Sequence, residues 1–323
     1  MKKKKLKIGV LFGGKSAEHE VSIMSAKNII RALDKEKYQI FPIKINRNGK
    51  FNFNIIKKMD VIFPVLHGPF GEDGSMQGLL KVLNLPFVGS SVLGSVVSMD
   101  KDVMKKLLKE AGIPIGKFIV LCVTEKITFE KVIKILGSSL FIKPANMGSS
   151  VGIKKAENKK EFVAGIKNAF RYDSKIIIEE TINGREIECS VLGNEKPLAS
   201  IPGEIVPIND FYSYKAKYIK KNGADLLIPA KLTKATIKKV QNLAIKVFQT
   251  LNCEGMGRVD FFVKKNGEVL VNEINTIPGF TAISMYPKLW EASGLPLPKL
   301  LDKLINLAIE RFKRESKLKT TVS

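Results

Sequence analysis

The chain has 323 residues, of which 45% are hydrophobic and 26% charged, a composition typical of a folded protein of two or three domains. Its longest uncharged apolar runs, near Val61–Leu66 and Val92–Met99, are far shorter than the roughly 20 residues that a membrane-spanning helix needs. The net charge of +23 is the sign that attracts nucleic acid or a phosphate-bearing substrate. However, most of the basic residues are lysines scattered over nearly every segment, as on ordinary solvated faces, and no arginine-rich stripe or aromatic ladder accompanies them.

The lysine-rich start of the chain resembles the beginning of a signal peptide. Its apolar part, within Lys7–Phe12, is only about six residues long, and no small-residue cleavage site follows. Three widely separated cysteines and only two histidines argue against a disulfide framework and against a zinc site. We therefore expect a buried first strand and a cytoplasmic protein.

The first hundred residues alternate short apolar runs with helical patterns, which predicts parallel βαβ units. In such sheets ligands collect beyond the carboxyl ends of the strands. Two polar, glycine-bearing segments lie there, at 13–22 and at 67–78. The expected strands are Lys7–Phe12, Gln39–Ile45 and Val61–Leu66, and the expected helices are Val21–Leu33 and Gly74–Leu83.

A second unit begins near Met99, and the last third of the chain is mostly β up to Asn275. The second unit is expected to contain helices over Asp100–Ala111, Thr128–Leu136 and Lys159–Arg171, with strands over Phe118–Val123, Leu140–Lys143 and Lys175–Glu180. The last third is expected to contain strands over Glu186–Leu192, 255–263 and 267–275, with helices over Thr233–Leu251, Ser284–Ala292 and Pro298–Arg314.

A hairpin near the C-terminus carries the most informative pattern. If the Asn-Gly dipeptide at 266–267 is its two-residue turn, Asp260 faces Glu273 and Arg258 faces Asn275, and all four share one face. Facing carboxylates repel unless a positive charge lies between them. Carboxylate and amide oxygens suit a hard cation such as Mg²⁺. The alternative is a solvated hairpin in which Arg258 neutralises its neighbours.

Lys143 ends a predicted strand and is followed by a loop rich in glycine and serine. Gly148 and Gly152 flank Ser149 and Ser150, so the loop could fold over phosphates with its N–H groups and hydroxyls. Such loops are also common as plain connectors.

The segment Gly9–Ser16 matches the phosphate-binding pattern G-x-x-x-x-G-K-[ST]. Its first four residues belong to the predicted apolar strand, which leaves only Gly13 and Gly14 as loop. We therefore reject a phosphate-binding loop there.

Glu18 and His67 stand at expected strand ends, and each has two interpretations. Glu18 is either a partner of a helix dipole or a ligand for a substrate ammonium group. His67 is either bonded to backbone or in contact with a substrate in the same crevice.

Taken together, these segments resemble the D-alanine–D-alanine ligases of the ATP-grasp superfamily over nearly the whole chain. The matching segments occur in family order: GGKSAEHEVS, HGPFGEDGSMQG, MDK at 99–101, KPANMGSSVG, YKAKY, GRVDF and NEINTIPGFT. The resemblance implies an α/β and α+β fold, with an N-terminal Rossmann-like (preATP-grasp) parallel sheet followed by a two-lobed ATP-grasp body. The implied domains are residues 1–98, 99–184 and 185–323.

The resemblance also implies an ATP site and a metal site. ATP would lie between the two lobes, together with two Mg²⁺ ions, or Mn²⁺ in their place. The implied phosphate contacts are Lys101, Lys143 and Ser150, the adenine contacts Glu179, Glu180 and Ile182, the ribose contact Glu186, and the metal ligands Asp260, Glu273 and Asn275.

The substrates implied by the resemblance are two D-alanine molecules, joined through an acyl phosphate for peptidoglycan precursor synthesis. The first alanine would meet Glu18, hydrogen-bonded with Ser149 and Tyr218, and His67. The second alanine and the oxyanion would meet Arg258, Gly279, Ser284 and Met285, and Lys217 would reach the transferred phosphate.

Two rival functions remain open at this point. One is another carboxylate–amine ligase of the same superfamily, and the other is a basic nucleic-acid-binding protein. We favour the ligase, acting as a homodimer without a membrane or nucleic-acid partner.

Overall fold

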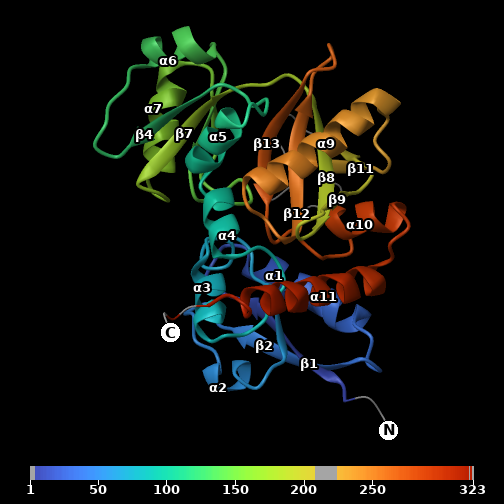
Figure 1. Cartoon of the computed structure of the whole chain (residues 1–323). Coiled ribbons are helices and arrows are strands. Elements are labelled where there is room, and N and C mark those ends of the chain that lie inside the picture. Colours follow the sequence, from blue (N-terminus) through green and yellow to red (C-terminus); the bar gives the residue numbers. More distant parts are fainter. Residues whose placement is uncertain (1–3, 208–223, 320, 322–323) are drawn as a thin grey trace.

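Three β-sheets organise the chain in the computed structural model, which describes residues 4–207, 224–319 and 321 (Figure 1). The N-terminal sheet has the order β2-β1-β3 and is parallel, as predicted, with β1 at Leu6–Gly13, β2 at Tyr38–Ile45 and β3 at Val61–Val65. One face packs against α1 (His19–Ala32) and the other against α3 (Ser75–Val82). The connections also contain α2 (Phe53–Ile56) and α4 (Val92–Met99).

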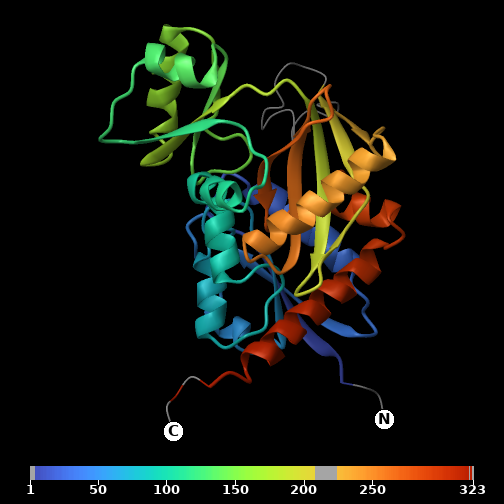
Figure 2. The ribbon, with the colours of Figure 1, turned by 45° about the horizontal axis from the view of Figure 1, so that its top comes forward.

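The second sheet has four antiparallel strands in the order β4-β7-β5-β6. It carries its own core with α6 (Phe129–Leu136) and α7 (Lys159–Ala169). Figures 1 and 2 both show this unit standing apart from the other two sheets. Its strands are β4 (Phe118–Cys122), β5 (Leu140–Pro144), β6 (Lys154–Ala156) and β7 (Lys175–Glu180).

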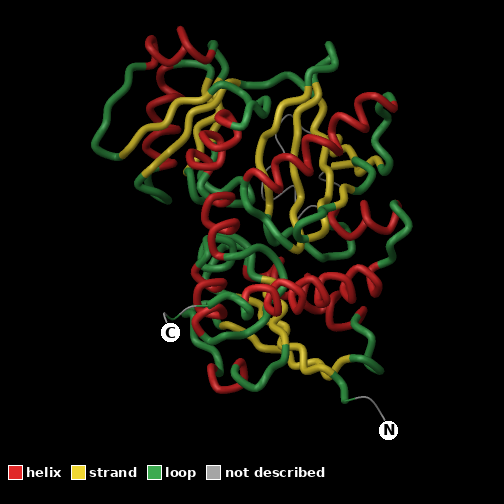
Figure 3. The backbone as a smooth tube through the Cα atoms, in the orientation of Figure 1, coloured by secondary structure: helices red, strands yellow, loops and turns green. Residues whose placement is uncertain are grey.

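The third sheet has six strands in the order β11-β10-β8-β12-β13, with β9 paired to β8. Helix α9 (Lys234–Thr250) covers one face, and α10 (Met285–Ala292) packs against β8. Figure 3 shows this sheet of long strands between its helices. The strands are β8 (Arg185–Gly193), β9 (Leu198–Ala199), β10 (Gly203–Pro207), β11 (Ala224–Leu227), β12 (Gly255–Val263) and β13 (Val269–Asn275).

Two helices pack against a sheet other than the one nearest to them in sequence. Met104 and Leu108 of α5 (Lys101–Glu110) join the core of the third sheet rather than that of the second. Apolar residues of α11 (Leu297–Glu315), such as Leu304, complete the core of the N-terminal sheet. No helix in the described part of the chain is both long enough and apolar enough to cross a membrane.

The predicted hairpin forms, but its predicted two-residue turn is wrong. The backbone carbonyl of Lys264 accepts from Gly267 N–H, and the backbone N–H of Lys264 donates to Glu268 O. The strands are therefore joined by a three-residue loop in which Gly267 has φ +82°. A β-bulge, which leaves Asn272 as the extra residue, then shifts the register by one. Beyond the bulge Asp260 faces Glu273, as predicted, because the two departures cancel.

Candidate active site

The predicted functional residues gather where the three sheets meet. Glu18, after β1, accepts a hydrogen bond from the Ser149 hydroxyl in the loop after β5. Lys101, at the start of α5, donates to Met147 O at 2.8 Å, and its ammonium lies 3.6 Å from Glu273 Oε2. These contacts link the N-terminal unit, the second sheet and the third sheet at one place.

Three neighbouring strands of the third sheet place charged side chains on one face. Arg258 donates to both oxygens of Asp260, at 2.7 and 2.8 Å, and lies 2.9 Å from Glu188 Oε2. Asn275 Nδ2 donates to Asp260 Oδ2 at 3.0 Å. Asp260 faces Glu188 on one side and Glu273 on the other. The predicted cluster of Arg258, Asp260, Glu273 and Asn275 is therefore confirmed as a geometric arrangement, and Glu188 extends it.

This face fits a hard divalent cation by the chemistry of its donors. Asp260, Glu273 and Asn275 offer carboxylate and amide oxygens, which Mg²⁺ prefers, with water and phosphate as its other ligands. Arg258 and Lys101 currently neutralise the two carboxylates. Within residues 4–207, 224–319 and 321, no three His, Cys, Asp or Glu side chains approach closely enough to hold a metal by themselves.

A buried cluster of opposite charges lies under the second sheet. Lys143 forms an ion pair with Glu179, whose other oxygen lies 2.8 Å from Lys105 Nζ. Burial alone would raise the pKa of Glu179, but Lys105 and Lys143 lower it to about 2. Burial likewise opposes the charge on Lys143, yet attraction by Glu179 and Glu273 raises its pKa. Both groups are therefore charged at neutral pH, and the Lys143 ammonium is paired with Glu179.

The other residues predicted for ATP lie around the same junction. Glu180 Oε1 accepts from Lys117 N–H at 2.7 Å, and Ile182 lies beside Gly116. Glu186 is half-buried on β8, two residues before Glu188 and therefore on the same face of the sheet. Ser149 and Ser150 both have positive φ, 49° and 61°. Such strained backbone in a loop is common at functional sites.

Glu18 occupies the N-cap position of α1, but its side chain does not cap the helix. Its carboxylate instead accepts a hydrogen bond from the Ser149 hydroxyl, so Glu18 has a partner beyond its own helix. Gly68 has φ +72°, and a Cβ there would lie only 2.7 Å from Glu18 Oε2. The positive φ favours glycine here, and a Cβ would displace the Glu18 carboxylate from its present position.

His67 is buried, with Nδ1 at 2.9 Å from Ile277 O and Nε2 at 3.4 Å from Ser25 Oγ. Burial lowers its pKa, which favours the neutral ring. Nδ1 therefore has the backbone partner of the first interpretation, and Nε2 has the Ser25 hydroxyl as its neighbour.

Glu72 was missed by the sequence analysis. Its carboxyl accepts N–H groups from Gly68, at 2.8 Å, and from Ile277, at 3.1 Å, and so joins the loops after β3 and β13. Burial, reinforced by Glu18, raises the pKa of Glu72 to about 8. A carboxyl within the glycine-bearing segment after a strand was the signal that could have revealed it.

The loop after β13 brings Gly279 and Ser284 together. Thr281 N–H donates to Ser284 Oγ at 3.0 Å, and a Cβ at Gly279 would lie 2.6 Å from that oxygen. Met285 is buried in a small core with Ile205 and Leu289, so its side chain supports the loop by packing. Lys217 and Tyr218 lie outside the described residues.

The rejection of a phosphate-binding loop at Gly9–Ser16 is confirmed. Residues 9–13 lie in β1, and Gly14 N–H donates to Ile45 O at 3.0 Å. Only a tight turn remains, which cannot wrap a phosphate.

Comparisons with known proteins agree with this geometry. The family model described as D-ala D-ala ligase C-terminus matches residues 107–306, and that described as D-ala D-ala ligase N-terminus matches 7–56 and 53–90. A D-alanine–D-alanine ligase from Oceanobacillus iheyensis is 48% identical, over 99% of both chains. The solved D-alanine–D-alanine ligase from Coxiella burnetii is 41% identical, with a TM-score of 0.86, over 97% of this chain and 98% of that one. The Bacillus anthracis enzyme, solved in complex with ATP, is 34% identical, with a TM-score of 0.83, over 96% and 99%.

Proposed function

The chain belongs to the D-alanine–D-alanine ligase family, and we propose that this ligase activates a first D-alanine as an acyl phosphate before a second attacks it. The overall reaction uses ATP to join two D-alanine molecules into D-alanyl-D-alanine, a peptidoglycan precursor. The observation that carries the assignment of residues is the contact between Glu18 and Ser149 beside Lys101 and the charged face.

In the first step the alanine carboxylate attacks the γ-phosphorus of ATP, and ADP leaves. The ammonium of this alanine would lie against Glu18, whose carboxylate Ser149 orients. Lys101, Lys143 and Ser150 would hold the phosphates, since positioning and charge neutralisation dominate phosphoryl transfer. The side chain of Glu179 keeps Lys143 charged and in place, and so acts through Lys143. The backbone from Glu179 to Ile182 would border the adenine.

Asp260, Glu273 and Asn275 would bind one or two Mg²⁺ ions, or Mn²⁺ in their place. Bound metal supplies charge that offsets the negative phosphate oxygens. Arg258 and Lys101 would then turn from these carboxylates toward the substrates, because the metal takes over the neutralisation.

In the second step the amine of the second D-alanine attacks the acyl carbon and loses a proton, and phosphate leaves. Negative charge develops on the carbonyl oxygen only in this tetrahedral state. Arg258 and the N–H of Gly279 would stabilise that oxygen, and Ser284 would orient the incoming alanine. Lys217 and Tyr218 are assigned to the same step on sequence grounds.

Residues 1–98, 99–184 and 185–323 are proposed as the three domains of a cytoplasmic homodimer. The limits fit the three sheets, whose strands fall within these ranges. Helices α5 and α11 pack across the limits, so the domains share cores at their junctions.

Phosphate release with ATP and Mg²⁺ tests the function. We expect release with D-alanine but not with L-alanine, together with the formation of D-alanyl-D-alanine. Hydroxylamine added with D-alanine should trap the acyl phosphate as D-alanine hydroxamate. Dipeptide without any trapped hydroxamate would contradict the intermediate, and phosphate release without dipeptide would contradict ligation.

A further inference from the structure

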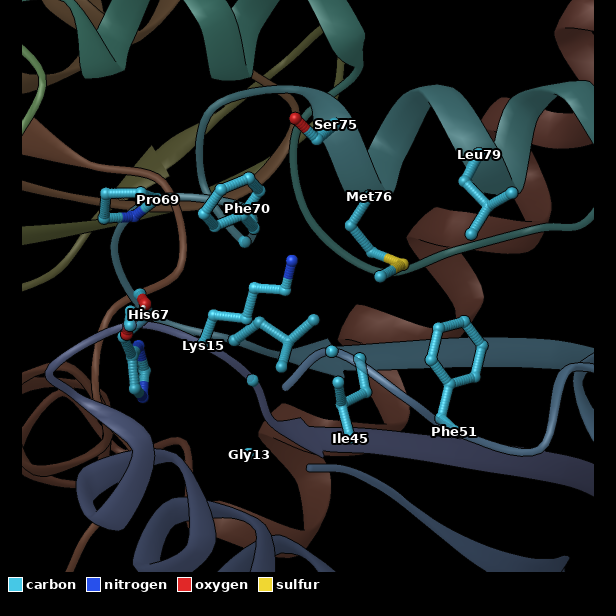
Figure 4. A pocket seen from close by; sticks show the side chains of 15 residues that line it. Gly13, Lys15, Ile45, Phe51, His67, Pro69, Phe70, Ser75, Met76 and Leu79 are labelled. Atoms are coloured by element: carbon cyan, nitrogen blue, oxygen red, sulfur yellow. Dashed lines mark hydrogen bonds between the residues drawn. The ribbon is translucent and has the colours of Figure 1, made fainter. Parts of the chain in front are cut away.

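A separate pocket of about 260 Å³ lies inside the N-terminal unit, between the carboxyl end of β3 and α3 (Figure 4). It is smaller than the roughly 300–1,000 Å³ of drug-sized sites, so it suits a small molecule. None of the residues assigned to ATP or metal lines it, whereas His67, which the resemblance places beside the first D-alanine, does. Its apolar walls come from Ile45, Phe51, Leu66, Phe70, Met76 and Leu79.

Lys15 is the lysine of this pocket, and its side chain runs between Phe70 and Met76 in Figure 4. The Lys15 ammonium lies 5.3 Å from the centre of the Phe70 ring. No Asp or Glu is among the described residues that line the pocket. No carboxylate elsewhere in the described part of the chain lies within 4 Å of the Lys15 ammonium. The pocket therefore combines apolar walls with one positive charge that no carboxylate of the described residues neutralises.

Two unusual backbone features keep this arrangement in place. Gly49 has φ +83°, a conformation that favours glycine, and a Cβ there would lie 2.4 Å from Lys15 Cε and displace the lysine side chain. Phe70 has φ +65° although it is not glycine, and its ring is 56% exposed. Its N–H donates to Asp73 Oδ2 at 2.8 Å. Strained backbone that holds an exposed aromatic ring over a cavity is a feature of ligand sites.

We propose that this pocket binds a small amphipathic anion, a carboxylate attached to a short apolar body. The body would lie against the apolar walls, and the carboxylate would pair with Lys15 near the rim formed by Phe70. A neutral molecule of the same shape would gain the apolar contacts alone, and a cation would meet the lysine with like charge.

The pocket also touches the loop that carries Glu18. Ser16 lines the pocket, donates to His67 O at 2.7 Å and accepts from Glu18 N–H at 3.1 Å. A ligand of the pocket favours the conformation in which the pocket exists, and in that conformation Glu18 reaches Ser149. Resting on the proposed function, we expect such a ligand to lower the KM for the first D-alanine.

Calorimetric titration of the full chain with 3-phenylpropionate, without ATP or D-alanine, tests binding separately from catalysis. We expect one site, at least about fivefold tighter for this probe than for neutral 3-phenylpropan-1-ol, as one ion pair allows. Lys15→Gln should remove the difference between the two probes. Leu79→Trp should fill the pocket and abolish both, whereas Val82→Trp, on the exposed face of the same helix, should change neither.

Competition of the probe with D-alanine or ATP, or unchanged binding in Leu79→Trp, would overturn the site. In turnover assays, saturating probe should lower the KM for D-alanine about twofold or more in the wild type and not in Lys15→Gln. Binding with an unchanged KM would overturn the coupling. An inactive wild type that still binds the probe would overturn the proposed function and leave the pocket standing.

Discussion

Glu72 shows how one buried side chain can set the pH response of the junction. Its carboxyl lies between the loops after β3 and β13 and accepts one N–H from each. Because its pKa rises to about 8 in the folded chain, folding favours the protonated form. The resulting stability is fully present below the ordinary pKa of 4.5 and is lost as the pH rises through about 8.

The variant Glu72→Gln should therefore remove one pH-dependent contribution to the free energy of unfolding. Relative to this variant, the wild type should lose stability as the pH rises from 5 to 9. The reason is that the Glu72 carboxyl ionises inside the folded protein, whereas the glutamine amide does not titrate. Thermal melts of both proteins across this range measure the difference. Glu110→Gln, on an exposed surface, is the control and should track the wild type. A constant difference between wild type and Glu72→Gln would refute the assignment.

Lys143→Ala should weaken ATP binding roughly 30-fold or more, about the 2 kcal/mol of a hydrogen bond to a charged group. The buried ion pair with Glu179 holds this ammonium in place, and Lys105 still pairs with Glu179 in the variant. Lys15→Ala is the matched control. It should change ATP affinity less than about tenfold, because Lys15 belongs to a tight turn at the end of a strand and not to a phosphate-binding loop. Equilibrium binding of ATP measures both, and the reverse order would contradict the ATP site.

At the scale of elements, the hairpin of β12 and β13 shows what the sequence could and could not predict. The pairing of Asp260 with Glu273 was predicted correctly, but through a turn that does not form. Local turn chemistry favours Asn-Gly as a two-residue turn. If the strands paired without a bulge from that turn, the side chain of Asn272 would face the core. The bulge lets Val269 and Val271 face the core instead. The burial of Val269 and Val271 set the register, and the Asn-Gly dipeptide alone does not show which residues will be buried.

One-residue deletions in this hairpin should have opposite outcomes. Removing Lys265 leaves Asn266 and Gly267 as a two-residue turn between Lys264 and Glu268, so stability and turnover should be retained. Removing Val271 instead places the amide of Asn272 in the core, which should cost about 2 kcal/mol or more. Denaturant unfolding and phosphate release compare the two proteins. Equal loss in both would show that the tip, and not the core, sets the register.

Asp260→Asn and Glu273→Gln should each abolish phosphate release while the chain stays folded. Each replaces an anionic oxygen ligand with a neutral amide on a half-buried face. Neither variant should stabilise the metal-free protein, because Arg258 and Lys101 already neutralise these carboxylates. Glu268→Gln, at the exposed tip of the same hairpin, should keep full activity. Normal turnover in Asp260→Asn or Glu273→Gln would remove the metal assignment.

At the scale of the whole molecule, the order of strands and helices followed from hydrophobic patterns, but the partners of two helices did not. Amphipathic patterns place Met104 and Leu304 on buried faces without naming the sheet that buries them. In the structure α5 packs on the third sheet, and α11 packs between the third sheet and the N-terminal one. The strands β6, β9 and β11 were also missed, because two to four residues are too few to show a hydrophobic period, and β10 was missed as well. Contacts between distant segments are decided by the shape of the whole fold.

The contact of Glu18 with Ser149 joins two units, and a double-mutant cycle should detect it. Glu18→Gln and Ser149→Ala should each lower kcat/KM for D-alanine, and their effects should be non-additive by roughly 0.5–3 kcal/mol. The control is Glu20→Gln with Arg47→Gln, an exposed pair 2.7 Å apart within the N-terminal unit. That pair should be silent, because exposed ion pairs contribute little. Additive effects of Glu18→Gln and Ser149→Ala would show that the two units act independently.

The packing of α11 on the N-terminal sheet bears on how the chain is made. On the ribosome, β1, β2 and β3 emerge first, yet one face of their sheet is completed by Leu300, Leu301 and Leu304. At roughly 5–20 residues per second, synthesis leaves that apolar face covered only in part, by α1, for more than about ten seconds. The nascent N-terminal unit is then expected to bind a chaperone that shields apolar surface. It should need that chaperone until α11 has been synthesised and has packed on the sheet.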